Sequence, residues 1–179
     1  MIFTQTPLTG AYLIDIEPIR DERGFFTMSF SESEFITHDL EFRFPWSNLS
    51  FNYEKGVLRG MHYQTAPYQQ VKLVRCVRGA IYDVIIDLRK DSKTHGKWFG
   101  VYLTDTNNTS LYIPKDFAHG YLTMERSCMI SYQISDPHNK QSEQGYMWND
   151  LEFRIDWPKR PEILSDRDKA YPKFIRGIE

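Results

Sequence analysis

Hydrophobic and polar residues alternate through the middle of the chain, in short runs separated by turn-forming residues. The clearest runs span residues 71–77, 80–88, 98–104, 110–113, 120–124 and 128–134. Arg78-Gly79 and the segment 106–108 supply the strongest turn signals between them. Strands of this length at this spacing predict an all-β body, either a sandwich or a barrel.

Helix signals are confined to the periphery. Ser31 and Glu34 have the spacing of a capping box, and Phe35 supplies an apolar contact, so we expect a short helix after Ser31. From Trp157 onward, prolines at 158, 161 and 172 predict an irregular segment that wraps across the body. The predicted fold is therefore all-β with short peripheral helices.

Composition and charge narrow the class of protein. The 179 residues suffice for one sizeable core, so we expect a single domain over 1–179. A formal net charge of -2 without a charged tail indicates neither a nucleic-acid nor a membrane partner. Cys76 and Cys128 lie in apolar runs, which predicts buried thiols in a reducing compartment. We find neither a basic leader nor an apolar run near the roughly 18 residues of a membrane span, and expect a cytoplasmic protein.

Polar side chains occur where the alternation predicts an apolar interior. Lys72 and Tyr132 each share a strand face with apolar neighbours two residues away, so both polar groups would point inward and need partners. His62 and His119 lie just before strand-like runs. These positions indicate a site inside the β-body or at its mouth.

The two histidines suggest a metal centre as one alternative. Such a centre needs three or four ligands, often including a His-x-His pair. Gln64 stands two residues after His62 and Gly60 two residues before it, so the pair is missing. We therefore predict no metal, and a purely structural histidine remains the alternative for His62 taken alone.

Six polar residues on different predicted strands or their ends could converge in a barrel interior. They are Arg59, His62, Lys72, His119, Tyr132 and Asp168. Such a set supplies an imidazole base, a phenol acid and a cation for a developing oxyanion. These groups are required to remove and return a proton next to a carbonyl.

Several motifs resemble those of one known family in their order and approximate spacing. They include "DERGFF" (21–26), "GVLRGMHYQ" (56–64), "IPKDFAHGY" (113–121) and "LSDRD" (164–168), and the likeness covers roughly residues 3–168. The family is that of the dTDP-4-dehydrorhamnose 3,5-epimerases. The resemblance implies a double-stranded β-helix of the cupin jelly-roll type, a homodimer, no metal and no dissociable cofactor. It also implies a nucleotide-diphosphate 4-keto-6-deoxy sugar as the substrate.

The same resemblance implies catalytic roles. His62 is similar to the family's base, and Asp168 to the carboxylate that orients it. Tyr132 resembles the acid on the opposite face of the sugar, and Lys72 the residue near the C4 oxygen. Together they would remove protons from C3 and C5, which the C4 ketone acidifies, and return them on the other face.

Substrate-binding positions are implied in the same way. Arg59 resembles a diphosphate ligand, and Arg23 an arginine that reaches the site of the neighbouring subunit. The other positions expected to contact substrate are Asn48, Gln64, His119, Glu143 and Arg167.

Two positions depart from the family pattern. Met28 stands where many members have a glutamate, and His138 where a second tyrosine is frequent. These departures leave open an epimerase that acts at C3 or C5 only, or on another nucleotide's sugar. A cupin 3,4-ketoisomerase, a non-catalytic sugar-binding jelly roll and a metal-dependent oxygenase are more distant alternatives.

Overall fold

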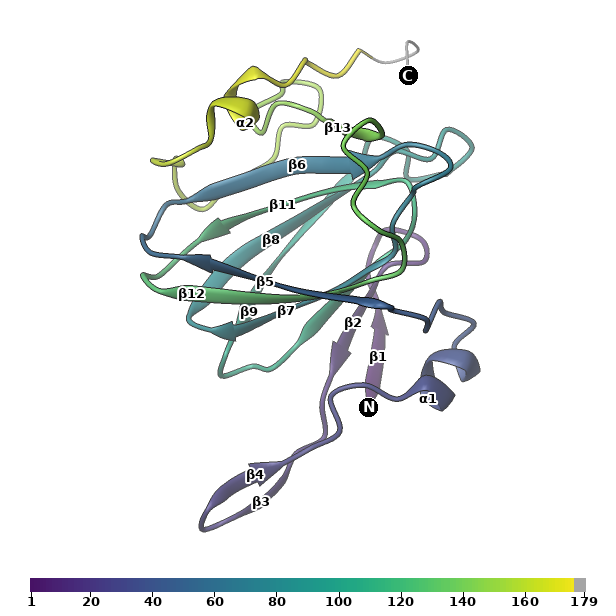
Figure 1. Ribbon diagram of the computed structural model, residues 1–179, viewed down its shortest axis with the longest axis vertical. Coiled ribbons are helices and arrows are strands. Elements are labelled where there is room, and N and C mark those ends of the chain that lie inside the picture. The colour runs from purple at the N-terminus through teal and green to yellow at the C-terminus, as the bar shows by residue number, and fades with distance from the viewer. Residues whose placement is uncertain (176–179) are drawn as a thin grey trace.

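Two antiparallel β-sheets packed against each other form the body of the protein, as a computed structural model describes for residues 1–175 (Figure 1). The six-stranded sheet has the order β1 (Ile2–Gln5), β2 (Tyr12–Asp15), β10 (Ser110–Ile113), β7 (Lys72–Arg78), β12 (Cys128–Ile134) and β5 (Trp46–Asn52). The five-stranded sheet has the order β13 (Glu143–Gly145), β6 (Leu58–Gln64), β11 (Phe117–Thr123), β8 (Ala80–Asp87) and β9 (Trp98–Thr104). Most neighbouring strands are distant in sequence, as in a jelly roll, which confirms the predicted fold class.

Apolar side chains from both sheets fill the space between them, which we call the lumen. Val74 and Cys76 of β7 and Ile130 of β12 point into it, as the alternation predicts. Cys76 and Cys128 are buried free thiols, which confirms their expected place in the core. The faces assigned from the two-residue period are therefore right for these strands.

His62 and His119 lie inside strands, so the expectation that both precede strands is wrong. Strands β6 and β11 are neighbours, and glycines obscure their alternation. A side chain on Gly60 would place its Cβ 2.5 Å from the Cα of Gly120 and 2.8 Å from the His119 carbonyl oxygen. Glycine at position 60 thus permits a close approach of the two strands.

A hairpin and a helix extend from the body after β2. β3 (Ile19–Asp21) and β4 (Gly24–Phe26) form a separate two-stranded sheet that projects away from the body, and α1 (Glu32–Thr37) follows (Figure 1). Ser31 is the N-cap of α1, as predicted, but the capping box is not formed. The Ser31 hydroxyl contacts that of Ser33, and the Glu34 carboxylate pairs with the N-terminal amine instead.

The C-terminal segment wraps over the outer face of the five-stranded sheet, but it is not wholly irregular as predicted. It forms α2 (Asp166–Ala170), which lies over β6 (Figure 1). Ser165 caps this helix, because its hydroxyl accepts a hydrogen bond of 3.0 Å from the Asp168 amide. Phe153 and Phe174 anchor the segment beside Met61 of β6. Neither of the two helices within residues 1–175 is long and apolar enough to cross a membrane.

Candidate active site

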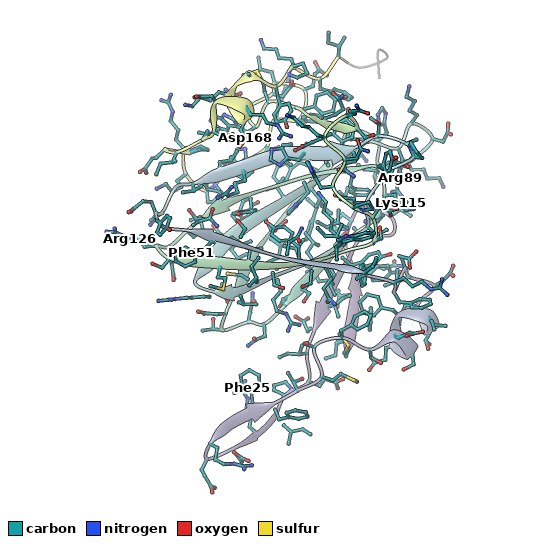
Figure 2. The ribbon with its side chains drawn as sticks, viewed as in Figure 1. Phe25, Phe51, Arg89, Lys115, Arg126 and Asp168 are labelled. Atoms are coloured by element: carbon teal, nitrogen blue, oxygen red, sulfur yellow. The ribbon has the colours of Figure 1, made fainter. Side chains whose placement is uncertain are left out.

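His62 and Asp168 form a close pair where α2 meets β6. Nε2 of His62 lies 2.5 Å from Oδ1 of Asp168, and Figure 2 shows Asp168 on α2, above β6. Asp168 is only 4% exposed, so its carboxylate is largely shielded from water. An Nε2–H donated to this carboxylate leaves Nδ1 of His62 as the basic nitrogen.

The surroundings of Asp168 favour its ionised form. Burial acts to raise the pKa of this carboxyl, but the hydrogen bond and charge of His62 and the hydroxyl of Ser165 outweigh burial. The pKa of Asp168 is therefore lowered from its usual value. An ionised carboxylate stabilises the imidazolium that forms when His62 accepts a proton.

A second histidine–aspartate pair lies within the lumen. His119 stands opposite His62 in the β6–β11 ladder, so both side chains lie on one face of the sheet. Its Nε2 lies 2.9 Å and 3.0 Å from the two carboxylate oxygens of Asp83 on β8, and both residues are buried. Asp83 in turn attracts Lys72 of the opposite sheet. Burial lowers the pKa of Lys72 to about 8, and the charge of Asp83 opposes part of that shift.

Tyr132 brings a phenol to the same space. Its ring centroid lies 6.2 Å from that of His119. Burial raises the pKa of Tyr132 well above its usual value, Tyr121 and Asp83 raise it further, and the charge of Arg59 opposes them. Tyr132 is therefore a neutral phenol at physiological pH, which is the form that can donate a proton.

Arg59 is fixed by a polar chain that joins the two sheets. Its Nε donates to Oδ1 of Asn52 on β5 at 2.8 Å, and Nδ2 of Asn52 donates to the Tyr121 hydroxyl at 3.1 Å. The hydroxyls of Ser50 and Tyr121 lie 2.9 Å apart. This chain sets the direction of the guanidinium and of Tyr121, the neighbour of Tyr132.

The six residues expected to converge are thus linked through direct contacts or shared neighbours. A cavity of about 390 Å³ opens beside them, and its lining includes Arg59, His62, Arg167 and Asp168. A larger cavity, of about 470 Å³, lies next to Tyr63 and contains none of the residues expected to be catalytic. The smaller cavity therefore reaches Arg59, His62 and Asp168, whereas Lys72, His119 and Tyr132 lie behind its lining.

Glu143 of β13 joins two segments at the edge of this cavity. Its carboxylate forms an ion pair with Arg167 of α2 and lies 2.6 Å from Nε2 of His138. Both Glu143 and Arg167 were expected to contact substrate. In the structure they hold α2, and with it Asp168, against β13.

The side chain of Gln64 forms hydrogen bonds to backbone groups of two loops. Its amide nitrogen donates to the carbonyl oxygens of Tyr68 and Pro137 at 2.6 Å and 3.1 Å, and its oxygen accepts from the Asn139 amide at 2.7 Å. These bonds hold the loop that carries His138, and a substrate contact by Gln64 stays a prediction. Within the described chain, no three His, Cys, Asp or Glu side chains are grouped so that they could hold a metal ion.

Asn48 and Arg23 lie at the outer parts of the molecule. Asn48 on the edge strand β5 stands directly opposite Tyr132 of β12 and is exposed. Arg23 lies at the turn of the β3–β4 hairpin, paired with Asp21, and its side chain is 84% exposed. The hairpin projects on the far side of the body from α2 (Figure 1), so Arg23 is not part of its own chain's cavity.

Sequence reasoning missed four residues that shape this site, namely Asn52, Asp83, Tyr121 and Tyr171. Asp83 is the single charged residue between 80 and 86 in an apolar run, and that isolation could have been read as a buried functional acid. Tyr171 lies with its ring centroid 5.5 Å from that of His62 and accepts a hydrogen bond of 2.8 Å from Arg167. It escaped notice because the helix that positions it was not predicted.

A jelly roll that pairs a histidine–aspartate couple with a neutral phenol and a half-buried lysine is suited to proton transfer at carbon, the chemistry of one class of isomerases. The family model described as dTDP-4-dehydrorhamnose 3,5-epimerase matches residues 5–175. The chain belongs to the dTDP-4-dehydrorhamnose 3,5-epimerase family.

Individual relatives agree with this assignment. The dTDP-4-dehydrorhamnose 3,5-epimerase of Methanothermobacter thermautotrophicus is 41% identical over 172 residues, which cover 94% of this chain and 92% of that protein. A crystal structure of the Bacillus anthracis enzyme with TDP and PPi bound superimposes with a TM-score of 0.94 at 38% identity, covering 97% of this chain and 99% of that one. The Legionella pneumophila enzyme in complex with dTDP-4-keto-L-rhamnose gives a TM-score of 0.90 at 34% identity, covering 96% and 92%.

Proposed function

We propose that this protein inverts C3 and C5 of dTDP-4-dehydro-6-deoxy-glucose and so forms dTDP-4-dehydrorhamnose. The observation that carries the proposal is the 2.5 Å contact between His62 and the buried Asp168, at a cavity shared with Arg59. A ketone at C4 acidifies the C–H bonds at C3 and C5. A base on one face of the sugar and an acid on the other suffice to invert each carbon.

His62 acts as the base. Its Nδ1 takes the proton from carbon, the electron pair of the broken C–H bond moves toward C4, and negative charge develops on the C4 oxygen. Asp168 stabilises the imidazolium that results. Lys72, a cation below its pKa of about 8, stabilises the enolate oxygen.

Tyr132 acts as the acid. Its hydroxyl proton passes to the same carbon from the opposite face, and the C4 carbonyl re-forms as the electron pair returns. The base has then gained one proton and the acid has lost one, and exchange with solvent resets both. The raised pKa of Tyr132 supports this role, since the phenol is fully protonated before each turnover.

Arg59 is the proposed diphosphate ligand, because its guanidinium is oriented by Asn52 and lines the cavity. Arg167 lines the same cavity from α2. Asn48, His119, Glu143 and Gln64 are the proposed contacts to the sugar or nucleotide, and Glu143 and Gln64 also hold the surrounding segments. Arg59 and Arg167 supply the positive charge that a diphosphate requires.

We also propose a homodimer in which Arg23 reaches the neighbouring site. Within residues 1–175 the hairpin that carries it pairs with no other strand, and it exposes Ile19, Phe25 and Phe26, with exposed Met28 directly after it. An apolar arm of this kind is typical of an interaction surface. Two buried free thiols fit a reducing compartment, so we propose a cytoplasmic location.

Deuterium incorporation tests the reaction. Incubation with dTDP-4-dehydro-6-deoxy-glucose in heavy water should place deuterium at C3 and C5, as NMR would show. His62→Ala should abolish the exchange, because His62 is the proposed base. Tyr132→Phe should keep exchange at some level while it slows inversion by about a hundredfold or more, because a general acid typically contributes 10²–10⁴.

Other outcomes separate the alternatives. Exchange at C3 or C5 alone would identify an epimerase of one centre, and a product with its carbonyl at C3 would identify a ketoisomerase. Retained affinity without any exchange would mean a sugar-binding protein. Exchange at neither carbon, with this or any related nucleotide 4-keto sugar, would contradict the proposed chemistry.

A further inference from the structure

Arg75 is a cation on the outer face of the six-stranded sheet, where the catalytic proposal gives it no role. It lies on β7, and its neighbours in the ladder are Ser110 of β10 on one side and Ser131 of β12 on the other. Lys72 and Val74 of the same strand point the other way, toward the lumen. Arg75 therefore sits on the back of the strands that carry Lys72 and Tyr132.

The Arg75 guanidinium is incompletely satisfied. Its Nε donates to the Ser110 hydroxyl at 2.9 Å, but its Nη2 is buried and has no hydrogen-bond partner among residues 1–175. Burial lowers the pKa of Arg75, and no carboxylate in the described chain offsets that effect. A partly desolvated guanidinium with one buried, unpartnered nitrogen favours an anion from outside residues 1–175.

A cavity of about 130 Å³ lies in front of this guanidinium. It is lined by Ser29, Leu73, Arg75, Val77, Ser110, Ser131 and Gln133. Three hydroxyls and one amide can donate hydrogen bonds into the cavity, and its lining contains no acidic side chain. A guanidinium surrounded by neutral donors is a set that favours an oxyanion over a cation or a neutral ligand.

We propose that this cavity, the Arg75 pocket, binds an oxyanion. Two sources share that chemistry: free phosphate, and a carboxylate of a second copy of this chain. The second source rests on the proposed homodimer, and exposed Leu49 and Val77 beside the pocket make this face suitable for contact with another copy. The first source does not depend on the homodimer.

Phosphate binding tests the first source. The wild-type protein is saturated with dTDP, which occupies the proposed nucleotide site, and is then titrated calorimetrically with sodium phosphate at constant ionic strength set by sodium chloride. A free-anion site predicts saturable binding that Arg75→Met abolishes and Arg75→Lys weakens. Arg78→Met is the matched control, since Arg78 is an exposed arginine at the end of the same strand, and it should bind phosphate as the wild type does.

Self-association tests the second source. Sedimentation equilibrium of the same variants, without phosphate, should show the dimer dissociation constant raised at least tenfold in Arg75→Met and unchanged in Arg78→Met. Phosphate binding that Arg75→Met leaves intact, or no effect of Arg75→Met on either phosphate or association, would overturn the proposal. The deuterium-exchange experiment tests the proposed epimerase reaction on its own, so the oxyanion proposal and the epimerase proposal can fail independently.

Discussion

The surroundings of Lys72 affect both the pKa of its ammonium group and the role that we propose for it in the reaction. Burial between the sheets lowers the pKa of its ammonium group to about 8, and the charge of Asp83 opposes part of that shift. The same desolvation strengthens the attraction between the ammonium and an enolate oxygen, because charges interact more strongly where water is excluded. Lys72, which we propose stabilises the intermediate, should therefore also limit activity at high pH.

We expect the rate of proton exchange to fall as the pH rises through about 8, because Lys72 then loses its charge. Lys72→Met should lower the exchange rate by roughly 10²–10³, the range typical of removing one oxyanion donor. The variant should also lose the alkaline decline. Rates of deuterium incorporation measured between pH 6 and 10 check both points, and Lys115→Met, at a half-exposed lysine, is the control.

The pH dependence of the free energy of unfolding tests the lowered pKa of Lys72 independently of activity. The pKa of Lys72 is lower in the folded protein than its ordinary value of 10.5, so the charged lysine weakens the fold below about pH 8. The destabilisation caused by the charged lysine decreases as the pH rises from about 8 to 10.5, because Lys72 loses its proton in the folded protein. The free energy of unfolding of the wild type should therefore gain on that of Lys72→Met across this window. A constant difference between the two proteins would contradict the assigned pKa.

At the scale of elements, regular alternation predicted most of the fold, and interruptions of the pattern hid the rest. The runs that became β7, β8, β9, β10 and β12 could be located from the sequence because their inward side chains are apolar. The predicted run 120–124 captured only the second half of β11, and β6 was missed because Gly60 interrupts its alternation. Helix α2 was missed because five residues are too few for a periodic signal.

The residues of the candidate site likewise divide into those that a local sequence pattern indicates and those that only tertiary contacts reveal. His62, Lys72 and Tyr132 could be named because they are polar residues in strand-like surroundings or in a distinctive motif. Asn52 and Tyr121 could not, since their importance lies in bonds between sheets that no local pattern encodes. Resemblance to a family supplied the role of Asp168, which lies 106 residues from its partner.

Helix α2 provides an element-scale prediction through Tyr171. This ring packs close to His62, and Gly145 of β13, which stands opposite His62 in the ladder, leaves space for it. A Cβ on Gly145 would lie 2.7 Å from Cε1 and Cζ of Tyr171. Tyr171 and Asp168 thus hold the imidazole from two sides, which makes Tyr171 a positioning residue.

Tyr171→Ala should lower kcat by about tenfold or more while KM changes little, because a small misplacement of a catalytic group is costly and no substrate contact is lost. Tyr171→Phe keeps the ring and loses the bond from Arg167, so its kcat should fall only a few-fold. Steady-state kinetics on both variants measure this, with Tyr53→Ala at an exposed tyrosine as the control. A change confined to KM in Tyr171→Ala would assign Tyr171 to substrate binding instead.

For the whole molecule, the most distinctive feature is the projecting hairpin. In the part of the chain that the structure describes, its strands pair only with each other, and Phe25, which Figure 2 shows on this arm, is 47% exposed while Phe26 is 78% exposed. A second copy of the chain is the proposed partner that covers these side chains. Arg23 at the turn would then complete a site whose base and acid belong to the other subunit.

Subunit mixing checks that arrangement. Arg23→Ala and His62→Ala are each expected to be nearly inactive, the first through loss of a nucleotide contact and the second through loss of the base. After the two variants are unfolded and refolded together in equal amounts, half of the dimers should be mixed, and one of the two sites in each should contain both Arg23 and His62. Activity should therefore recover to about a quarter of the wild-type value, as follows from a twofold dimer with shared sites.

In the matched control, the single variants His62→Ala and Asp168→Asn are unfolded and refolded together in the same way. His62 and Asp168 meet within one chain, so every site in a mixed dimer still lacks one of the two residues, and mixing should restore nothing. Recovery in the first mixture and none in the second would place Arg23 in the neighbouring site. Equal, negligible activity in both, with dimers that demonstrably exchange subunits, would mean that Arg23 does not act across the interface and that the apolar hairpin serves association alone.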